Sequence, residues 1–189
     1  MNIEILTLNE INVKDFALAR NKMLKKATSN WILFIDTDET ISPKLKKEIE
    51  NLDSKNFNGF YIKRKIIFLG KEIGEDKVLR LAKKGVGEWK RKVHETWEVK
   101  GKVGVLKNYI IHETGKNLFS YIEKMNRYSD IHAKENLREI KKSNLFKIIF
   151  YPKVKFVQNI FSGRGFIFSM LQSFHSFLSW TKQWELQKK

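Results

Sequence analysis

The fold prediction for this chain starts from residues 31–39, which read Trp31-Ile32-Leu33-Phe34-Ile35-Asp36-Thr37-Asp38-Glu39. Five consecutive apolar residues have the length of a strand, and an unbroken apolar run is typical of a strand buried on both faces of a parallel or mixed sheet. The run stops abruptly at an acidic segment, residues 36–39. Because ligands of open α/β sheets bind beyond the carboxyl ends of the strands, this segment is the first candidate for a binding site.

The segments on either side of this strand give the sequence an α/β pattern. Residues 3–8 have the composition of a short strand, and Asp15 is a suitable N-cap for a helix that ends near residues 28–30. Beyond the acidic segment, Ser42 followed by Pro43 predicts the start of a second helix. A chain that alternates strand and helix in this way forms a sheet with helices packed on it.

The pattern changes after residue 59, where β-rich segments replace the alternation of strand and helix. Strands are predicted at four places, namely 60–69, 78–82, 93–99 and 109–111. From Asn117 onward, apolar residues recur at helical spacing. We therefore predict an α/β fold with a mixed sheet flanked by helices in residues 1–115, followed by a helical region in residues 116–189.

The composition restricts the function classes. The 189 residues include 37 Lys and Arg against 21 Asp and Glu, a formal net charge of +16, and no cysteine. The absence of cysteine excludes a disulfide scaffold, a thiolate zinc site and a cysteine nucleophile. Lysines outnumber arginines 30 to 7, whereas arginine is the better residue for phosphate and guanine recognition. A basic nucleic-acid-binding protein is thus the weaker alternative.

The excess charge is concentrated at the C-terminal end. Residues 141–189 carry nine basic side chains and one acidic side chain, together with eight of the 14 phenylalanines. A basic and aromatic helical surface of this kind is typical of contact with an anionic membrane face, or it covers another part of the protein or a partner. The start of the sequence lacks the pattern of a signal peptide, so we expect a cytoplasmic protein, at the cytoplasmic face of the membrane.

Several short motifs follow one another in a recognisable order. They are Phe16-Ala17-Leu18-Ala19-Arg20-Asn21, the segment 31–39, Phe68-Leu69-Gly70, Arg80-Leu81, Val93-His94-Glu95, Ile111-His112, and the tail from Gly163-Arg164-Gly165-Phe166 to Trp180-Thr181-Lys182. Together they resemble the family 2 glycosyltransferases, which have a GT-A fold, and in particular the branch that contains lipopolysaccharide-core glucosyltransferases.

The resemblance implies a transferase that moves a sugar from a nucleotide-sugar donor to a lipid-linked or cell-envelope glycan. By that resemblance Asp36 faces the nucleotide, and Arg20 and Asn21 lie near it. Asp38 would bind Mn²⁺ or Mg²⁺ on the diphosphate, and His112 would be a further ligand of the metal or of phosphate. A divalent cation held by carboxylates and substrate phosphates neutralises a diphosphate leaving group.

The catalytic base is expected at Glu95. The pairs His94-Glu95 and His112-Glu113 lack the second histidine four residues on that a zinc protease helix requires. Glycosyl transfer with inversion instead needs a carboxylate that takes a proton from the acceptor hydroxyl. Arg80 and His94 are expected to contact the acceptor or a phosphate. A purely structural role for Glu95 and His112 is the alternative reading.

The resemblance also predicts a truncated GT-A-like sheet. Family 2 enzymes normally begin with a nucleotide-binding half, whereas here the acidic segment follows residues 3–8 after fewer than 30 residues. We expect the strand 3–8 to be the one that normally precedes the helix carrying Arg20 and Asn21. A non-catalytic remnant, or a chain completed by a partner that supplies the missing half, are therefore alternatives to an enzyme active by itself.

Overall fold

A computed structural model describes residues 2–8, 13, 15–90 and 95–188 of the chain. The chain divides into two compact units. Unit 1 comprises Met1–Ile66 and Glu75–Glu113, and unit 2 comprises Ile67–Gly74 and Thr114–Lys189. The two units are described separately.

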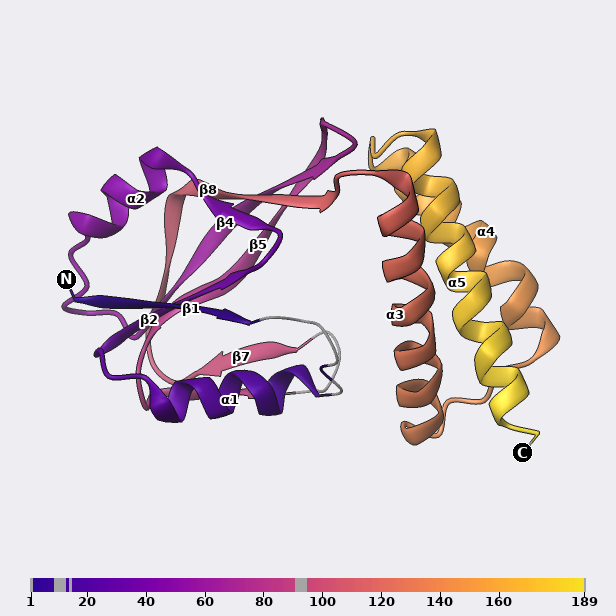
Figure 1. The fold of residues 1–189 in the computed structure, drawn as a ribbon, viewed down its shortest axis with the longest axis horizontal. Coiled ribbons are helices and arrows are strands. Elements are labelled where there is room, and N and C mark those ends of the chain that lie inside the picture. Colours follow the sequence, from indigo (N-terminus) through magenta and orange to yellow (C-terminus); the bar gives the residue numbers. More distant parts are fainter. Residues whose placement is uncertain (1, 9–12, 14, 91–94, 189) are drawn as a thin grey trace. The chain divides into compact units, whose positions relative to one another are not determined.

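Unit 1 is built on a mixed six-stranded sheet (Figure 1). Its strands in spatial order are β1 (Ile3–Leu8), β2 (Trp31–Asp36), β5 (Lys71–Lys83), β4 (Gly59–Phe68), β8 (Val103–Gly115) and β3 (Glu39–Ile41). β1 runs parallel to β2, whereas β2 is antiparallel to β5 and β3 is antiparallel to β8. The parallel register pairs Leu8 with Asp36, so the carboxyl ends of both strands lie together.

Strand β2 is buried along its whole length and supplies both faces of the core. Trp31, Leu33 and Ile35 pack in one cluster with Leu45 and Ile49 of helix α2 (Pro43–Glu50). The intervening Ile32 and Phe34 pack in a second cluster with residues of helix α1 (Phe16–Lys26). Because side chains alternate along a strand, Asp36 belongs to the α1 face.

A separate two-stranded ribbon completes the α1 face. Strands β6 (Gly87–Lys90) and β7 (Thr96–Val99) are antiparallel, and Trp89 is paired with Trp97. The two indole rings stack with centroids 5.3 Å apart, and Phe34 meets both of them edge-on. Gly87 permits the ribbon to form, because a Cβ at this position would lie 2.1 Å from the carbonyl oxygen of Glu98.

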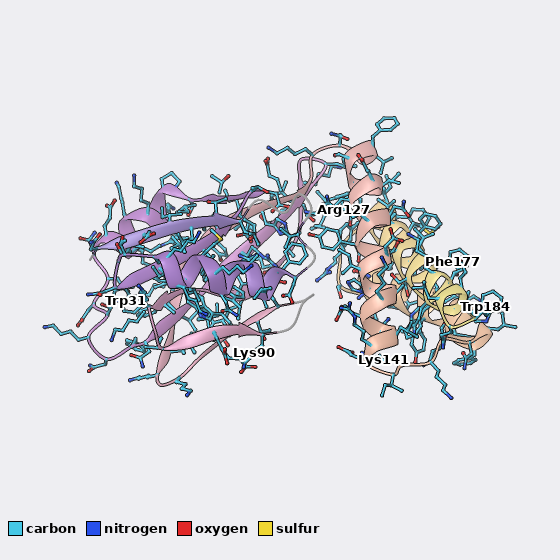
Figure 2. All side chains as sticks on the ribbon, turned by 60° about the horizontal axis from the view of Figure 1, so that its bottom comes forward. Trp31, Lys90, Arg127, Lys141, Phe177 and Trp184 are labelled. Atoms are coloured by element: carbon cyan, nitrogen blue, oxygen red, sulfur yellow. The ribbon has the colours of Figure 1, made fainter. Side chains whose placement is uncertain are left out.

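Unit 2 consists of three helices and the turn between β4 and β5. The helices are α3 (Leu118–Arg138), α4 (Leu145–Phe161) and α5 (Phe166–Leu186), and α5 packs on both of the others. Phe68 of the turn segment contacts Tyr121 of α3 and Phe168 of α5 at centroid distances of 5.0 and 5.3 Å. Figure 2 shows the side chains of both units, with Phe177 and Trp184 on α5. Within the described residues, every helix is too short or too polar to span a bilayer.

The predicted α/β fold, with a helical C-terminal region, is confirmed. The caps are correct as well, since the Asp15 carboxylate accepts from Leu18 N at 2.8 Å and the Ser42 hydroxyl from Leu45 N at 3.2 Å. The predicted strand extents need correction, because β5 and β8 each run for 13 residues and β7 begins at Thr96. Strands β3 and β6 were not predicted from the sequence.

The carboxylate of Glu48 attaches α2 to the sheet. Its oxygens accept hydrogen bonds from the backbone N–H groups of Lys107 and Asn108 and from the Asn108 amide, at 2.8–2.9 Å. Partial burial acts to raise the pKa of Glu48, but these hydrogen bonds to the charged form outweigh it and lower the pKa below its ordinary value of 4.5.

Glu48→Gln is expected to lower the free energy of unfolding at neutral pH by about 1 kcal/mol, because hydrogen bonds to a charged acceptor are replaced by neutral ones. A lowered pKa stabilises the fold above the unfolded pKa, and the stabilisation is lost as the pH falls through the folded pKa. The difference between the variant and the parent should therefore vanish in acid. Urea unfolding at several pH values measures it, with the exposed Glu50→Gln as control; a difference that is as large in strong acid as at neutral pH would contradict the assignment.

Candidate active site

Asp36 lies at the carboxyl end of β2, buried between two arginines. Its Oδ1 accepts from Arg20 Nη2 at 2.7 Å, and its Oδ2 accepts from Arg80 Nη2. Arg20 comes from α1, where Phe16, Ala17, Arg20 and Leu24 form the buried stripe, and Arg80 comes from β5, the neighbouring strand of β2. The helical spacing of α1 and the alternation of β2 thus bring charges of opposite sign to one point.

The ion pairs continue into a network that spans four strands. Arg80 also donates to Glu39 Oε1 at 3.1 Å, and Arg64 of β4 donates to the same oxygen at 3.0 Å. Arg64 in turn holds Asp76 of β5 through two bonds, at 2.6 and 2.9 Å. The second oxygen of Glu39 accepts from Asp36 N at 3.0 Å, which closes the turn between β2 and β3. Ion pairs between arginines and carboxylates therefore connect these strands next to the acidic segment.

The arginines determine the charge state of Asp36. Burial acts to raise its pKa, but Arg80 and Arg20 outweigh burial and hold the pKa of Asp36 below its ordinary value. Burial likewise acts to lower the pKa of Arg20, and Asp36 and Glu95 reverse that effect. Asp36 and Arg20 consequently both remain ionised at neutral pH.

Arg20 also connects Asp36 to Glu95. Its Nε donates to Glu95 Oε1 at 3.2 Å, and its guanidinium carbon lies 4.7 Å from the centroid of the Trp89 ring. The neighbouring Asn21 exchanges two hydrogen bonds with the backbone of Trp89, both at 2.8 Å. Asn21 thus fixes strand β6 against α1, and the ribbon carries Trp89 beneath the arginine.

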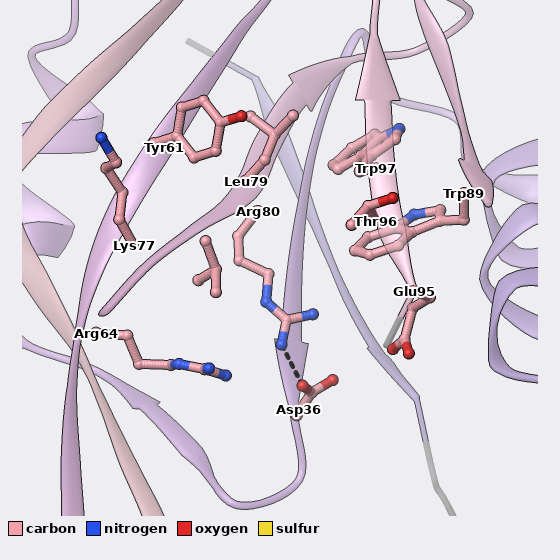
Figure 3. A pocket seen from close by; sticks show the side chains of 11 residues that line it. Asp36, Tyr61, Arg64, Lys77, Leu79, Arg80, Trp89, Glu95, Thr96 and Trp97 are labelled. Carbon is pink, nitrogen blue, oxygen red and sulfur yellow. Dashed lines mark hydrogen bonds and ion pairs between the residues drawn. The ribbon is translucent and has the colours of Figure 1, made fainter. Parts of the chain in front are cut away.

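A cavity of about 410 Å³ opens over this network (Figure 3). Figure 3 shows the side chains of Asp36, Arg80 and Glu95 together at one end of it. Its lining consists of Asp36, Tyr61, Arg64, Lys77, Val78, Leu79, Arg80, Trp89, Glu95, Thr96 and Trp97. The cavity combines carboxylates, cations and aromatic rings, which is a suitable lining for a polar ligand that carries phosphate and sugar groups.

Asp38, in the turn after β2, and His112, on β8, form a second, smaller pair. His112 Nε2 lies 3.2 Å from Asp38 Oδ2, and the backbone of Glu113 donates to Asp38 O at 2.9 Å. Strand β3 places the two side chains together, because its antiparallel register pairs Glu39 with His112. The other ring nitrogen, Nδ1, is buried and makes no hydrogen bond within the described residues, so Nε2 is the nitrogen that faces the carboxylate.

The donor set of this pair fits a divalent cation. A carboxylate oxygen and an imidazole nitrogen about 3 Å apart can bind the same ion, and Mg²⁺ or Mn²⁺ sites that include substrate phosphates need only one or two protein ligands. Within the described residues, no group of three or more ligating side chains is present. Phosphate oxygens would have to complete the coordination.

The candidate residues predicted from the sequence fall into three places. Arg20, Asp36, Arg80 and Glu95 are brought together by ion pairs, and Asp38 and His112 form the adjacent pair. Asn21 bonds to the ribbon backbone. His94 lies outside the described residues. Glu95 forms an ion pair with Arg20 at 3.1 Å.

Glu39, Arg64, Asp76 and the two tryptophans were not predicted as site residues. One signal in the composition identifies part of the set: only seven arginines occur among 37 basic residues, and Arg20, Arg64 and Arg80 are three of them. The planar fork of arginine can bind two carboxylates at once, which lysine does less well, so an arginine in a lysine-rich chain is a candidate for such a position. Nothing in the sequence indicated the stacking of Trp89 on Trp97, because it depends on the register of the ribbon.

Comparison with known proteins decides the family. The family model for glycosyl transferase family 2 matches residues 5–171, which include most of β1 and all of the site described above. The chain belongs to glycosyl transferase family 2. The match covers most of both units, so family membership rests on the whole arrangement and not on the acidic segment alone.

The relatives include one glycosyltransferase that is named for lipopolysaccharide core biosynthesis. The chain is 25% identical over 186 residues to the lipopolysaccharide core biosynthesis glycosyltransferase LpsC of Rhizobium meliloti, covering 89% of this chain and 69% of the relative. It is also 25% identical over 187 residues to uncharacterized glycosyltransferases of Rickettsia typhi and Rickettsia prowazekii, covering 85% of this chain. The match spans 64% of each of those two relatives, slightly less than two thirds.

Arg20→Met is expected to lower the free energy of unfolding by about 3 kcal/mol or more, because it removes a counter-charge from the buried Asp36 and from the half-buried Glu95. Urea unfolding measures the loss. The matched control is Arg138→Met, which removes an arginine that is 60% exposed in an ion pair with Glu135 and should change stability by less than about 1 kcal/mol. Equal, small effects at the two positions would show that Arg20 does not hold the site together.

Proposed function

We propose that this chain transfers a sugar from a nucleotide-sugar donor to a lipid-linked or cell-envelope glycan, with the help of a divalent cation. The observation that carries the proposal is the placement of one group of side chains at the end of β2 and of a second group at the turn that follows it. Asp36 lines the cavity together with Glu95, and Asp38, two residues further on, faces His112. One ligand that extends from the cavity to the turn would contact both groups.

The proposal assigns Asp38 and His112 to the cation. When bound there, Mn²⁺ or Mg²⁺ would neutralise the negative charge that develops on a nucleoside diphosphate leaving group. Asp36 is assigned to the nucleotide side of the donor. Since Arg20 and Arg80 already hold both of its oxygens, its first task is to keep this edge of the site in place. Arg80 is the proposed contact for a phosphate or for the acceptor.

Glu95 is the proposed general base. It would accept the proton of the attacking acceptor hydroxyl while that oxygen bonds to the sugar and the nucleoside diphosphate leaves. Glu95 lines the cavity and receives the Arg20 hydrogen bond on Oε1. This contact orients the carboxylate, and we assign the proton to its other oxygen, Oε2.

The relatives support the choice of acceptor only in part. LpsC is named for lipopolysaccharide core biosynthesis, and we extend this to the present chain as a proposal for a cell-envelope acceptor. Since such acceptors are anchored in lipid, we also propose that the protein works at the cytoplasmic face of a membrane. The alternatives, a non-catalytic remnant and a nucleic-acid-binding protein, both predict that Asp38 has no role in ligand binding.

Asp38→Asn is expected to reduce the affinity for nucleoside diphosphates in the presence of Mn²⁺ by at least about tenfold, because a charged ligand of the cation is lost. Isothermal titration with UDP, ADP, GDP and CDP in turn, each with and without Mn²⁺, measures the affinity. Asp53→Asn, at an exposed turn of the same unit, is the matched control. Unchanged binding by the Asp38 variant would refute the cation site, and no binding by the parent protein would favour the non-catalytic alternative.

Glu95→Gln is expected to lower the rate of sugar transfer by roughly 10²–10⁴-fold, the usual contribution of a general base, while nucleotide affinity stays within a few-fold. Glutamine keeps an oxygen that can accept from Arg20, so the ion-pair network loses charge but not its contact. The assay follows the release of nucleoside diphosphate from donor sugars in the presence of envelope glycans. Glu98→Gln, an exposed position on β7, serves as control. Full activity of the Glu95 variant would assign the base elsewhere.

A further inference from the structure

Helix α4 carries apolar side chains both on the side that packs within unit 2 and on the opposite, exposed side. Ile148, Pro152 and Asn159 are the residues that it buries within unit 2. The opposite side is exposed and still apolar, with a set of large side chains at helical spacing: Phe146, Ile149, Phe150, Val154, Val157 and Phe161. A surface helix of a globular protein normally presents polar residues on the side opposite its core, so this second face is an exception that needs a partner.

Helix α5 continues the same surface. Its exposed large side chains are Phe166, Ile167, Met170, Phe174 and Phe177. The two sets are contiguous, because Ile149 and Lys153 of α4 and Met170, Phe174 and Phe177 of α5 line one groove of about 340 Å³. We call the exposed residues of α4 and α5 named in these two paragraphs the α4–α5 face.

The charges around the α4–α5 face have one sign. Lys153 lines the groove itself, and its ammonium lies 5.4 Å from the centroid of the Phe150 ring. Lys155 is exposed but lies beside the buried residues Pro152 and Asn159 of α4, and Arg164 bonds to the Asn159 side chain at 3.3 Å. Lys153 is therefore the basic residue of the groove itself. The one acidic residue of the segment 141–189 is Glu185, in the last turn of α5. Long lysine side chains can lie along apolar surface while their charges reach the lipid headgroups.

We propose that the α4–α5 face binds the surface of an anionic lipid bilayer, with its aromatic and aliphatic side chains in the headgroup region and its lysines on lipid phosphates. Apolar area supplies the affinity and basic residues select the anionic surface. The charge pattern favours lipid over a second copy of the chain, because two such faces would bring like charges together. This inference deepens the membrane location in the proposed function, but it depends only on unit 2.

The test is co-sedimentation of the full chain with vesicles. The protein should bind vesicles of equimolar phosphatidylcholine and phosphatidylglycerol, bind weakly to phosphatidylcholine alone, and lose binding as salt is added. The double variant Ile149→Ser/Phe174→Ser should reduce the partition coefficient at least about tenfold, since burial of one large apolar side chain is worth about that factor. Lys153→Glu should weaken binding to the anionic vesicles and leave the weak binding to phosphatidylcholine vesicles unchanged.

Matched controls come from unit 1. Leu18 and Val105 are each 52% exposed, close to the 50% of Ile149, so Leu18→Ser/Val105→Ser removes comparable apolar surface and should leave vesicle binding unchanged. Lys46→Glu, on α2, is the control for Lys153. Equal losses in the control and test variants would overturn the proposal. A concentration-dependent dimer in light scattering, abolished by Ile149→Ser/Phe174→Ser and without vesicle binding, would overturn it in favour of a second copy of the chain.

The same variants separate this inference from the proposed chemistry. Ile149→Ser/Phe174→Ser should bind nucleoside diphosphate and Mn²⁺ as the parent protein does, because none of the site residues lies in unit 2. Vesicle binding without any nucleotide binding would support the lipid surface and refute the donor site. Nucleotide binding without vesicle binding would refute the lipid surface alone.

Discussion

The buried carboxylate of Asp36 is the constraint on which unit 1 depends. An ionised carboxylate at the end of a fully buried strand is strongly unfavourable unless cations and hydrogen bonds compensate for its lost hydration. Arg20 and Arg80 provide that compensation from α1 and β5. These two ion pairs also hold α1 on the sheet and β5 beside β2. The contacts that neutralise Asp36 therefore also stabilise the order of the strands.

The same network makes a rigid frame for the candidate chemistry. Glu95 comes from the segment before β7, which is distant in sequence from the acidic segment, and Arg20 joins the two by binding Asp36 and Glu95 with one guanidinium group. Asn21 and the stacked tryptophans hold the ribbon in place beneath it. A site in which the groups are positioned by ion pairs needs little reorganisation when a ligand arrives, which favours catalysis by preorganised charge.

The two units solve the problem of apolar surface in different ways. In unit 1, both faces of β2 are covered, by α2 on one side and by α1 with the ribbon on the other. In unit 2, α5 packs on α3 and α4, yet the α4–α5 face keeps a large exposed apolar area among basic residues. Large apolar patches on a protein surface generally mark a site of interaction. Here the positive charge near the patch favours an anionic partner.

By itself, the sequence determined the local elements and the type of fold. Local signals can be recognised without the tertiary structure, because each depends only on residues close together in the sequence. They are the apolar run 31–35, the caps at Asp15 and Ser42, and the helical spacing after Asn117. The sequence also indicated the family, through motifs in a fixed order. Only the tertiary structure decided that Asp36 is bound by Arg20 and Arg80, that Arg64 and Asp76 join the network, and that Asp38 meets His112. These contacts join residues up to 74 positions apart, and their partners are set by strand order and register, which no local pattern encodes.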